Sequence, residues 1–156
     1  MIVAIGVDHA GTPLHAAIVE ALADLGHEVL DLGVRDDYPD IALAVGRAVA
    51  TGAAARGVLA CGSGAGVGVA ACKIPGVRAQ TIHDGYTAHQ GVEHDAVNVL
   101  CLGARVIGDE VARELVATFA SARVSDDERH VRRRAKAEAL EREGLDARFD
   151  DTTTGE

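Results

Sequence analysis

A cysteine followed at once by a glycine-rich loop is the feature of this 156-residue chain with the clearest chemical meaning. Cys61 ends the apolar run 57–60, and the loop after it contains Gly62, Gly64 and Gly66. Glycine lets backbone N–H groups approach a ligand closely, because it has no Cβ to obstruct them. A thiol beside such donors suits a reaction in which a base removes a proton from carbon while an oxyanion forms.

The glycine loop matches neither of the common nucleotide-binding motifs. Aligning Gly62 and Gly64 with G-x-G-x-x-G places Val67 where the third glycine belongs, and the sequence has no Gly-Lys-Ser/Thr of a Walker loop. What remains is a general anion-binding nest, with a simple tight turn as the alternative.

Cys61 also has two interpretations. A free cysteine is often only a small buried hydrophobic residue, and we expect Cys72 and Cys101 to be of that kind. Cys61 differs because the N-terminus of a predicted helix follows it. That position favours the thiolate, which is the form of cysteine that acts as a base or a nucleophile.

Further polar residues lie near predicted strand ends. Asp8 and His9 follow the first predicted strand, so we expect them at the same sheet edge as Cys61. Asp8 could instead only accept hydrogen bonds from the amides of its own loop, and His9 could only cover the start of the next helix. His94 and Asp95 precede the last predicted strand, and their position alone indicates little.

The segment 129–136 is strongly basic and holds five of the 15 Lys and Arg residues. Arg129 and Arg133 are four residues apart, so on a helix they share one face and could bind one dianion together. The segment could equally be a solvated helix face. A nucleic-acid patch is disfavoured because the whole chain carries a net charge of −9.

Composition predicts one acidic domain with an aliphatic core. Hydrophobic residues make up 48% of the chain, yet only two Phe and two Tyr are aromatic. The net charge argues against binding to an anionic membrane, and no apolar run approaches the ~20 residues of a membrane span. We expect a domain over 1–143 and a polar, frayed tail over 144–156. Three cysteines and the lack of a signal-peptide pattern indicate a reducing cytoplasm.

Short apolar runs alternate with amphipathic or alanine-rich segments along the chain. Strands are expected at 2–7, 28–32, 57–61, 77–82 and 98–102, and helices at 12–25, 41–55, 65–73, 85–93, 109–121 and 126–143. This alternation predicts βαβ units, and therefore an α/β fold with a five-stranded parallel sheet and helices on both faces. Ligands bind such folds at the carboxyl ends of the strands.

Taken together, these segments resemble type B ribose-5-phosphate isomerases and their relatives, the galactose-6-phosphate isomerase subunits. The motifs that carry the resemblance occur in order at residues 6–11, 37–39, 61–66, 93–94, 98–100, 103–108 and 129–130. The resemblance implies a Rossmann-like three-layer α/β/α sandwich with a protruding C-terminal helix. It also implies a homodimer or a dimer of dimers, an active site between subunits, and neither a metal nor another cofactor.

The same resemblance implies roles for individual residues. Cys61 would be the base that moves a proton between C2 and C1 of a phosphorylated sugar, and Ser63 would support it. Asp8 and His94 would assist ring opening. The implied substrate-binding residues, of which the arginines of the basic helix come from the neighbouring subunit, are His9, Tyr38, Gly62, Gly64, Ala65, Gly66, Asp95, Arg105, Arg129 and Arg133.

Two positions depart from the pattern of that family, because Cys72 and Asp95 stand where it usually has Asn. An ionised Asp95 cannot donate a hydrogen bond, and it adds negative charge beside a phosphorylated substrate. The resemblance as a whole predicts an aldose–ketose isomerase of ribose 5-phosphate. Because Asp95 departs from the pattern, a hexose 6-phosphate or a tetrulose 4-phosphate is the alternative substrate. A non-catalytic module that binds phosphate or nucleotides is the third hypothesis.

Overall fold

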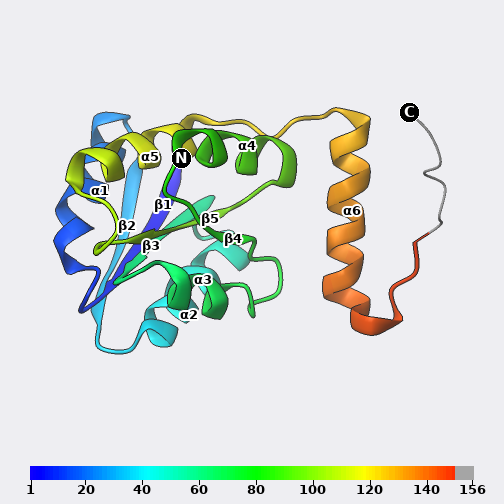
Figure 1. Cartoon of the computed structure of the whole chain (residues 1–156), viewed down its shortest axis with the longest axis horizontal. Helices are drawn as coiled ribbons and strands as arrows, with labels where there is room; N and C mark the ends of the chain where they lie inside the picture. Colours follow the sequence, from blue (N-terminus) through cyan, green and yellow to red (C-terminus); the bar gives the residue numbers. More distant parts are fainter. Residues whose placement is uncertain (150–156) are drawn as a thin grey trace.

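The computed structural model describes residues 1–149 and has a parallel five-stranded sheet covered by helices on both faces (Figure 1). The strands are β1 (Ile2–Asp8), β2 (Glu28–Arg35), β3 (Arg56–Cys61), β4 (Ala79–Thr81) and β5 (Val99–Gly103), in the spatial order β2-β1-β3-β5-β4. The helices are η1 (Thr12–Leu14), α1 (His15–Asp24), α2 (Tyr38–Ala50), α3 (Ala65–Ala71), α4 (Gly85–Asp95), α5 (Asp109–Ser121), α6 (Glu128–Glu143) and η2 (Gly144–Asp146). The predicted fold class is confirmed.

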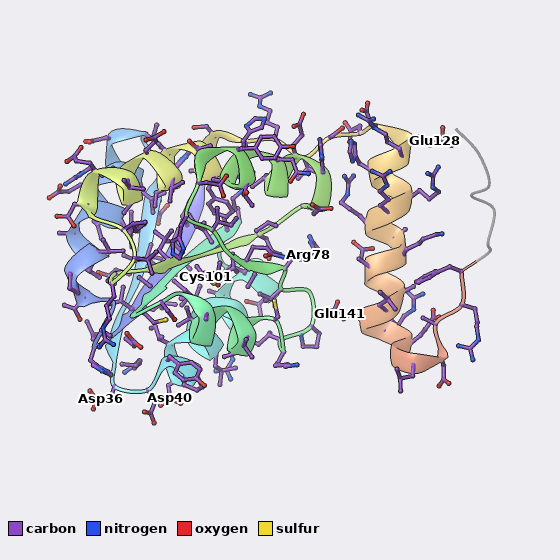
Figure 2. The ribbon with its side chains drawn as sticks, in the orientation of Figure 1. Asp36, Asp40, Arg78, Cys101, Glu128 and Glu141 are labelled. Atoms are coloured by element: carbon purple, nitrogen blue, oxygen red, sulfur yellow. The ribbon has the colours of Figure 1, made fainter. Side chains whose placement is uncertain are left out.

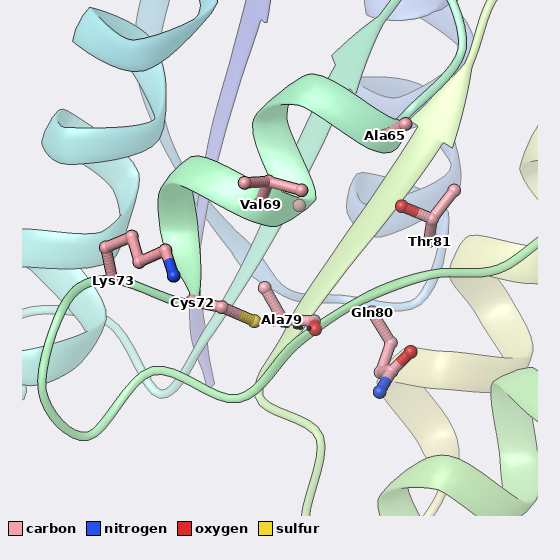
Figure 3. Close-up of a pocket in the computed structure, with 8 residues that line it drawn as sticks. Ala65, Val69, Cys72, Lys73, Ala79, Gln80 and Thr81 are labelled. Carbon is pink, nitrogen blue, oxygen red and sulfur yellow. Dashed lines mark hydrogen bonds between the residues drawn. The ribbon is translucent and has the colours of Figure 1, made fainter. Parts of the chain in front are cut away.

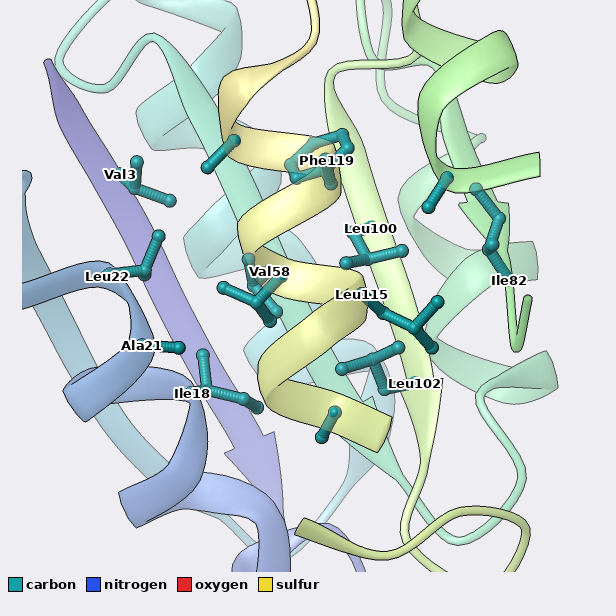
Figure 4. Packing of buried hydrophobic residues seen from close by; sticks show 14 of the residues in the cluster. Val3, Ile18, Ala21, Leu22, Val58, Ile82, Leu100, Leu102, Leu115 and Phe119 are labelled. Carbon is teal, nitrogen blue, oxygen red and sulfur yellow. The ribbon is translucent and has the colours of Figure 1, made fainter. Parts of the chain in front are cut away.

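Successive side chains of each strand point to opposite faces of the sheet, so the hydrophobic core has two halves. Val58 and Ala60 of β3 face a cluster built with α1, α4 and α5, in which Phe119 is the largest fully buried side chain (Figure 4). Leu59 and Cys61 of the same strand face the cluster built with α2 and α3. Because side chains alternate between the faces of a strand, this register directs Cys61 toward the α2 and α3 side.

The sheet order creates a crevice at the carboxyl ends of two neighbouring strands. β1 pairs with β2 on one side and with β3 on the other, so the chain leaves these strand ends in opposite directions. Such a switch point is where α/β sheets bind ligands. Asp8 ends β1 and Cys61 ends β3, which places the two residues beside the crevice.

Several element bounds differ from the predicted ones for local reasons. The second strand continues to Arg35 because it contains a bulge. Between Asp31 and Val34, β2 has one residue more than β1 has between Ile5 and Val7, and the pairing then resumes. Gly33 lies in this bulge and has φ +77°. The second helix begins at Tyr38, with Pro39 in its first turn, and ends at Ala50 instead of 55. β4 is only three residues long and lies at the sheet edge.

Helix α6 projects from the body of the molecule (Figure 1). Two contacts join it to the loop before β4: Glu141 Oε1 accepts from the Gly76 N–H at 3.0 Å, and Glu138 lies 3.8 Å from Arg78. Figure 2 labels Glu141 on the helix and Arg78 on the body. In the predicted tail, 144–146 form a short 3₁₀ turn, while 150–156 lie outside the described residues. Within residues 1–149, no helix has the length and apolar character needed to cross a membrane.

Gly11 marks the closest backbone approach beside the crevice. A Cβ at this position would lie 2.2 Å from the carbonyl oxygen of Ala60, although the φ of −85° suits any residue. We predict that Gly11→Ala lowers the free energy of unfolding by about 3 kcal/mol, because backbone atoms of β3 cannot move aside. Chemical denaturation measures this loss.

Gly85→Ala is the matched control, since its Cβ would meet only Glu114 Oε1 at 3.8 Å. We expect it to change the free energy of unfolding by less than about 1 kcal/mol. Equal stability of the Gly11 variant and the wild type would contradict the packing described for β1 and β3.

Candidate functional site

A cavity of about 390 Å³ lies at the carboxyl edge of the sheet, over the crevice between β1 and β3. It gathers a thiol, a carboxylate, an imidazole, a phenol and a guanidinium group from segments far apart in the sequence. The lining residues are Asp8, His9, Ala10, Tyr38, Cys61, Gly62, Ser63, Gly66, Arg105 and Val106. Eight of the residues predicted for the site therefore come together in one chain.

Cys61 is 5% exposed and lies at the end of β3, where its sulfur accepts a hydrogen bond from the Gly64 N–H at 3.1 Å. This contact is possible because Gly64 has φ +80°, a conformation that favours glycine. The next amide in the loop, that of Ala65, donates to Ser63 Oγ at 3.3 Å. The Gly64 contact holds the sulfur beside the glycine loop, which is the position that the predicted role of Cys61 as a base requires.

The end of β5 holds the Cys61 loop in place. The N–H groups of Ala104 and Arg105 donate to the carbonyl oxygens of Cys61 and Gly62, each at 2.9 Å. A Cβ on Gly103 would lie 2.6 Å from the Ser63 backbone, so the two segments are in direct contact. The same turn brings the guanidinium of Arg105 over Gly62 and into the lining of the cavity.

Asp8 and His9 reach the cavity from the end of β1. Asp8 is 5% exposed, and its Oδ1 accepts from the N–H groups of Ala10 at 2.9 Å and Gly11 at 2.8 Å. His9 Nδ1 lies 3.0 Å from the carbonyl oxygen of Asp36, so it donates there and leaves Nε2 for a ligand. Asp8 thus serves its own loop amides and lines the cavity as well.

Tyr38 closes the cavity from the first turn of α2. Its ring packs against Gly66, where a Cβ would lie 3.2 Å from two ring carbons. The side chain is 43% exposed, so one side of the ring meets solvent. A larger residue at Gly66 would push the phenol away from the cavity.

Six predicted residues do not line this cavity. Gly64 and Ala65 belong to the loop but not to the lining of the cavity, and the other four are His94, Asp95, Arg129 and Arg133. His94 and Asp95 end α4, five and four residues before Val99, which pairs with Gly57 at the amino end of β3. The length of β3 from Gly57 to Cys61, about 13 Å, separates them from the thiol. Within one chain, His94, the predicted ring-opening residue, therefore lies near the amino ends of the strands, and the Cys61 thiol lies at the carboxyl end.

The two arginines are displayed on the projecting helix. Arg129 and Arg133 are both exposed, and Arg129 lies 3.6 Å from Asp127 at the start of α6. His94 connects this helix to the body, because its ring stacks on that of His130 with the centroids 3.9 Å apart. His94 and the arginines therefore form a second group of predicted residues, apart from the Cys61 cavity.

A larger hollow of about 450 Å³ lies between α3 and the edge strand β4, away from the predicted catalytic residues (Figure 3). Ala65, Val69 and Cys72 line it from the helix side, and Lys73 lies at its end. The prediction that Cys72 is buried is wrong. Cys72 is exposed and its thiol donates to the Ala79 carbonyl at 3.1 Å, because no further strand covers β4. Cys101, by contrast, is fully buried, as predicted.

The contacts of some supporting residues were not predicted, although His83 follows a predicted strand end as Asp8 and Cys61 do. Thr81 Oγ1 donates to the Gly64 carbonyl at 2.9 Å, and His83 Nε2 accepts from the Gly103 N–H at 2.9 Å, so both fix the loops around Cys61. These contacts depend on strand order, which no local pattern reveals. Gln90 lies 2.8 Å from His94 Nδ1, and its i, i+4 spacing could have revealed it. No group of three His, Cys, Asp or Glu residues within 1–149 is arranged to hold a metal ion.

Comparison with known proteins gives this arrangement a context. The model of the ribose/galactose isomerase family matches residues 3–137. The chain belongs to this family. It is 38% identical to ribose-5-phosphate isomerase B of Escherichia coli over 143 residues, which cover 89% of this chain and 95% of that protein. It is 43% identical to D-erythrulose-4-phosphate isomerase 2 of Mycolicibacterium smegmatis over 121 residues, 73% of this chain and 80% of that one.

Solved structures of the family have the same fold. The type B ribose 5-phosphate isomerase of Trypanosoma brucei superposes with a TM-score of 0.85 at 43% identity, covering 89% of this chain and 97% of that one. The enzyme of Trypanosoma cruzi gives a TM-score of 0.87 at 41% identity, covering 91% and 99%. The family resemblance drawn from the sequence motifs is confirmed.

The three thiols differ in environment, so we predict different rates of alkylation. Cys72 is exposed and should react first with iodoacetamide, and Cys61 should follow through its cavity. Cys101 should stay unmodified in the native protein, because burial excludes the reagent and raises the pKa of its thiol. Peptide mapping by mass spectrometry measures the order. Labelling of native Cys101 as fast as of Cys72 would contradict the described core.

Proposed function

We propose that this protein interconverts an aldose phosphate and a ketose phosphate, with ribose 5-phosphate and ribulose 5-phosphate as the substrate pair. The observation that carries the proposal is the Cys61 thiol, which lines a cavity at the switch point of the sheet with the Gly64 amide on its sulfur. Membership of the ribose/galactose isomerase family supports the reaction class. The three free cysteines suit a reducing compartment, and we place the reaction in the cytoplasm.

The isomerisation moves two protons. As a thiolate, Cys61 takes the proton from C2 of the open-chain aldose, and the negative charge passes to the C1 oxygen in an enediolate. The thiol then returns that proton to C1, while a second proton moves from the C2 oxygen to the C1 oxygen and C2 becomes the carbonyl. Ser63 supports the second transfer, because a hydroxyl both donates and accepts. Backbone amides of the loop and the Arg105 guanidinium stabilise the developing oxyanion.

We further propose that the functional unit is a homo-oligomer in which each site takes residues from two chains. The separation of the Cys61 cavity from His94, Arg129 and Arg133 in one chain supports this arrangement. The projecting helix α6, with both arginines exposed, suits a reach toward a second copy. His9 of one chain and the two arginines of the other would then hold the phosphate, and His94 would protonate or deprotonate the sugar ring oxygen with Asp8.

Another sugar phosphate is the second candidate substrate. Asp95 is an exposed carboxylate at the end of α4, beside the proposed acid His94. Its charge disfavours a phosphate close by and could favour a different pattern of hydroxyl groups. The relatives named above include isomerases of both a pentose and a tetrulose phosphate, so the reaction type is common to both candidates.

We predict that Cys61→Ala lowers kcat for ribose 5-phosphate by about 10³-fold, because it removes the base, while the variant still folds. Cys72→Ala is the matched control and should retain wild-type kcat. A coupled assay with tetrose, pentose and hexose phosphates measures both variants and ranks the substrates by kcat/KM. Unchanged turnover of Cys61→Ala would remove the thiol as the base, and turnover of no sugar phosphate by the wild type would overturn the proposed function.

A second prediction concerns the shared site. Cys61→Ala and His94→Ala should each be nearly inactive alone with ribose 5-phosphate. When the two are co-expressed, half of the pairs are mixed and each mixed pair holds one intact site, so about a quarter of the wild-type activity should return. A co-expressed Cys61→Ala and Cys61→Ser pair is the control and should recover nothing. Lack of recovery in the mixed sample would place the whole site in one chain.

A further inference from the structure

We propose that His130 is a positioning residue that fixes the imidazole of His94 and couples it to the phosphate-binding Arg129. This inference rests on the proposed function, in which His94 opens the sugar ring and Arg129 holds the phosphate. It assigns to His130 a task that neither the thiol chemistry nor the phosphate contacts require. A pair of histidine rings is stacked where α4 meets α6.

The two rings lie face to face. The centroids of His94 and His130 are 3.9 Å apart, and the ring planes differ by 18°. His130 is 3% exposed, which makes it one of only two buried polar or charged residues among those described. A buried ring in stacking contact restricts the χ2 rotation of its neighbour, so His130 sets the plane of the His94 imidazole.

Other contacts fix which His94 nitrogen carries the proton. The Gln90 side-chain nitrogen donates to His94 Nδ1 at 2.8 Å, so a neutral His94 holds its proton on Nε2. His94 Nε2 lies 3.6 Å from Glu93 Oε2, and the His94 side chain is 28% exposed. Gln90 therefore selects the tautomer, His130 selects the ring plane, and Nε2 is the nitrogen available to a substrate.

His130 is suited to lie against a ring that changes charge. Burial lowers the pKa of His130, and the positive charges of His94, Arg129 and Arg133 lower it further, against the opposing effect of Asp127. Near neutral pH His130 is therefore uncharged. A neutral partner accepts the face of a protonated His94, whereas a second imidazolium would repel it.

His130 is also the connection to the phosphate-binding arginine. Arg129 Nε donates to His130 Nε2 at 3.1 Å, so the same ring contacts the guanidinium and stacks on the proposed acid. Arg134, on the next turn of α6, donates to the carbonyl oxygens of His94 at 3.2 Å and Ser125 at 2.9 Å. The groups proposed for the two ends of a substrate are thus held as one unit.

Sugar chemistry gives this role a specific kinetic signature. Ribose 5-phosphate closes to a furanose through its C4 oxygen, so its isomerisation must begin with ring opening. Ribulose 5-phosphate cannot close a five-membered ring, because its C5 oxygen carries the phosphate. An enzyme with a misplaced His94 would therefore still convert the ketose, and the open-chain aldose would leave and cyclise in solution.

The experiment compares initial rates in both directions for His130→Ala, His130→Phe and the control Arg132→Ala, which changes an exposed residue of the same helix. His130→Ala removes the stack, and we expect kcat with ribose 5-phosphate to fall about 10- to 100-fold, with a much smaller change for ribulose 5-phosphate. His130→Phe keeps the stack but cannot accept from Arg129, so kcat should stay close to wild type while KM rises for both substrates. If His130→Ala does not fold, His130→Leu replaces it with the same expectations.

A second measurement does not depend on turnover. In ¹⁵N NMR spectra, His94 should be the Nε2–H tautomer with one set of ring signals in the wild type and in His130→Phe, and should lose this single state in His130→Ala. Equal losses in the two directions, an unchanged kcat in His130→Ala, or the same kcat loss in His130→Phe would each overturn the positioning role. Those results leave the isomerase assignment intact, whereas a wild type that turns over no sugar phosphate overturns both.

Discussion

The close backbone contact of three strand ends is the constraint on which the Cys61 cavity depends. Gly11 after β1 touches the carbonyl of Ala60, and Gly103 at the end of β5 touches the backbone of Ser63. Neither position has room for a side chain. Hydrogen bonds from Ala104 and Arg105 to the Cys61 loop then fix its conformation, so the thiol sits on the rigid part of the fold. Such a position suits the proposed role of Cys61 as a base, which must reach two adjacent carbon atoms.

The remaining chemistry lies on a different part of the molecule. Polar contacts at Gly76, Arg78 and Arg134 tie α6 to the body, and the helix displays its arginines beyond the sheet. The chain is acidic as a whole, so this cluster of positive charge is local and suited to an anionic substrate. In the arrangement we propose, the base and the phosphate-binding arginines of one site come from different chains, so the site is complete only when two copies meet.

The sequence predicted most of the cavity because of one simple rule. Parallel strands end at one edge of the sheet, so Asp8, His9 and Cys61 had to lie close together once the strands were placed. The rule also explains what could not be predicted. Sheet order decides that β4 is an edge strand, and this exposes Cys72, which we expected to be buried because free cysteines often are.

Contacts between segments far apart in the chain could not be predicted from the sequence. The stack of His94 on His130 joins residues 36 positions apart, and the Thr81 contact with Gly64 joins neighbouring layers. The spacing of Arg129 and Arg133 predicted that both lie on one face of a helix, but it did not predict the direction in which that helix projects from the body. Family motifs supplied the expectation that this face serves another subunit.

The most direct measurement is a crystal structure of the oligomer with a phosphorylated hydroxamate, a stable mimic of the enediolate. We expect the hydroxamate oxygens to lie within hydrogen-bond distance of the Cys61 sulfur and the loop amides of one chain. The phosphate should contact His9 of that chain together with Arg129 and Arg133 of its neighbour. A hydroxamate seated in the hollow between α3 and β4, or a phosphate held without those arginines, would contradict the account.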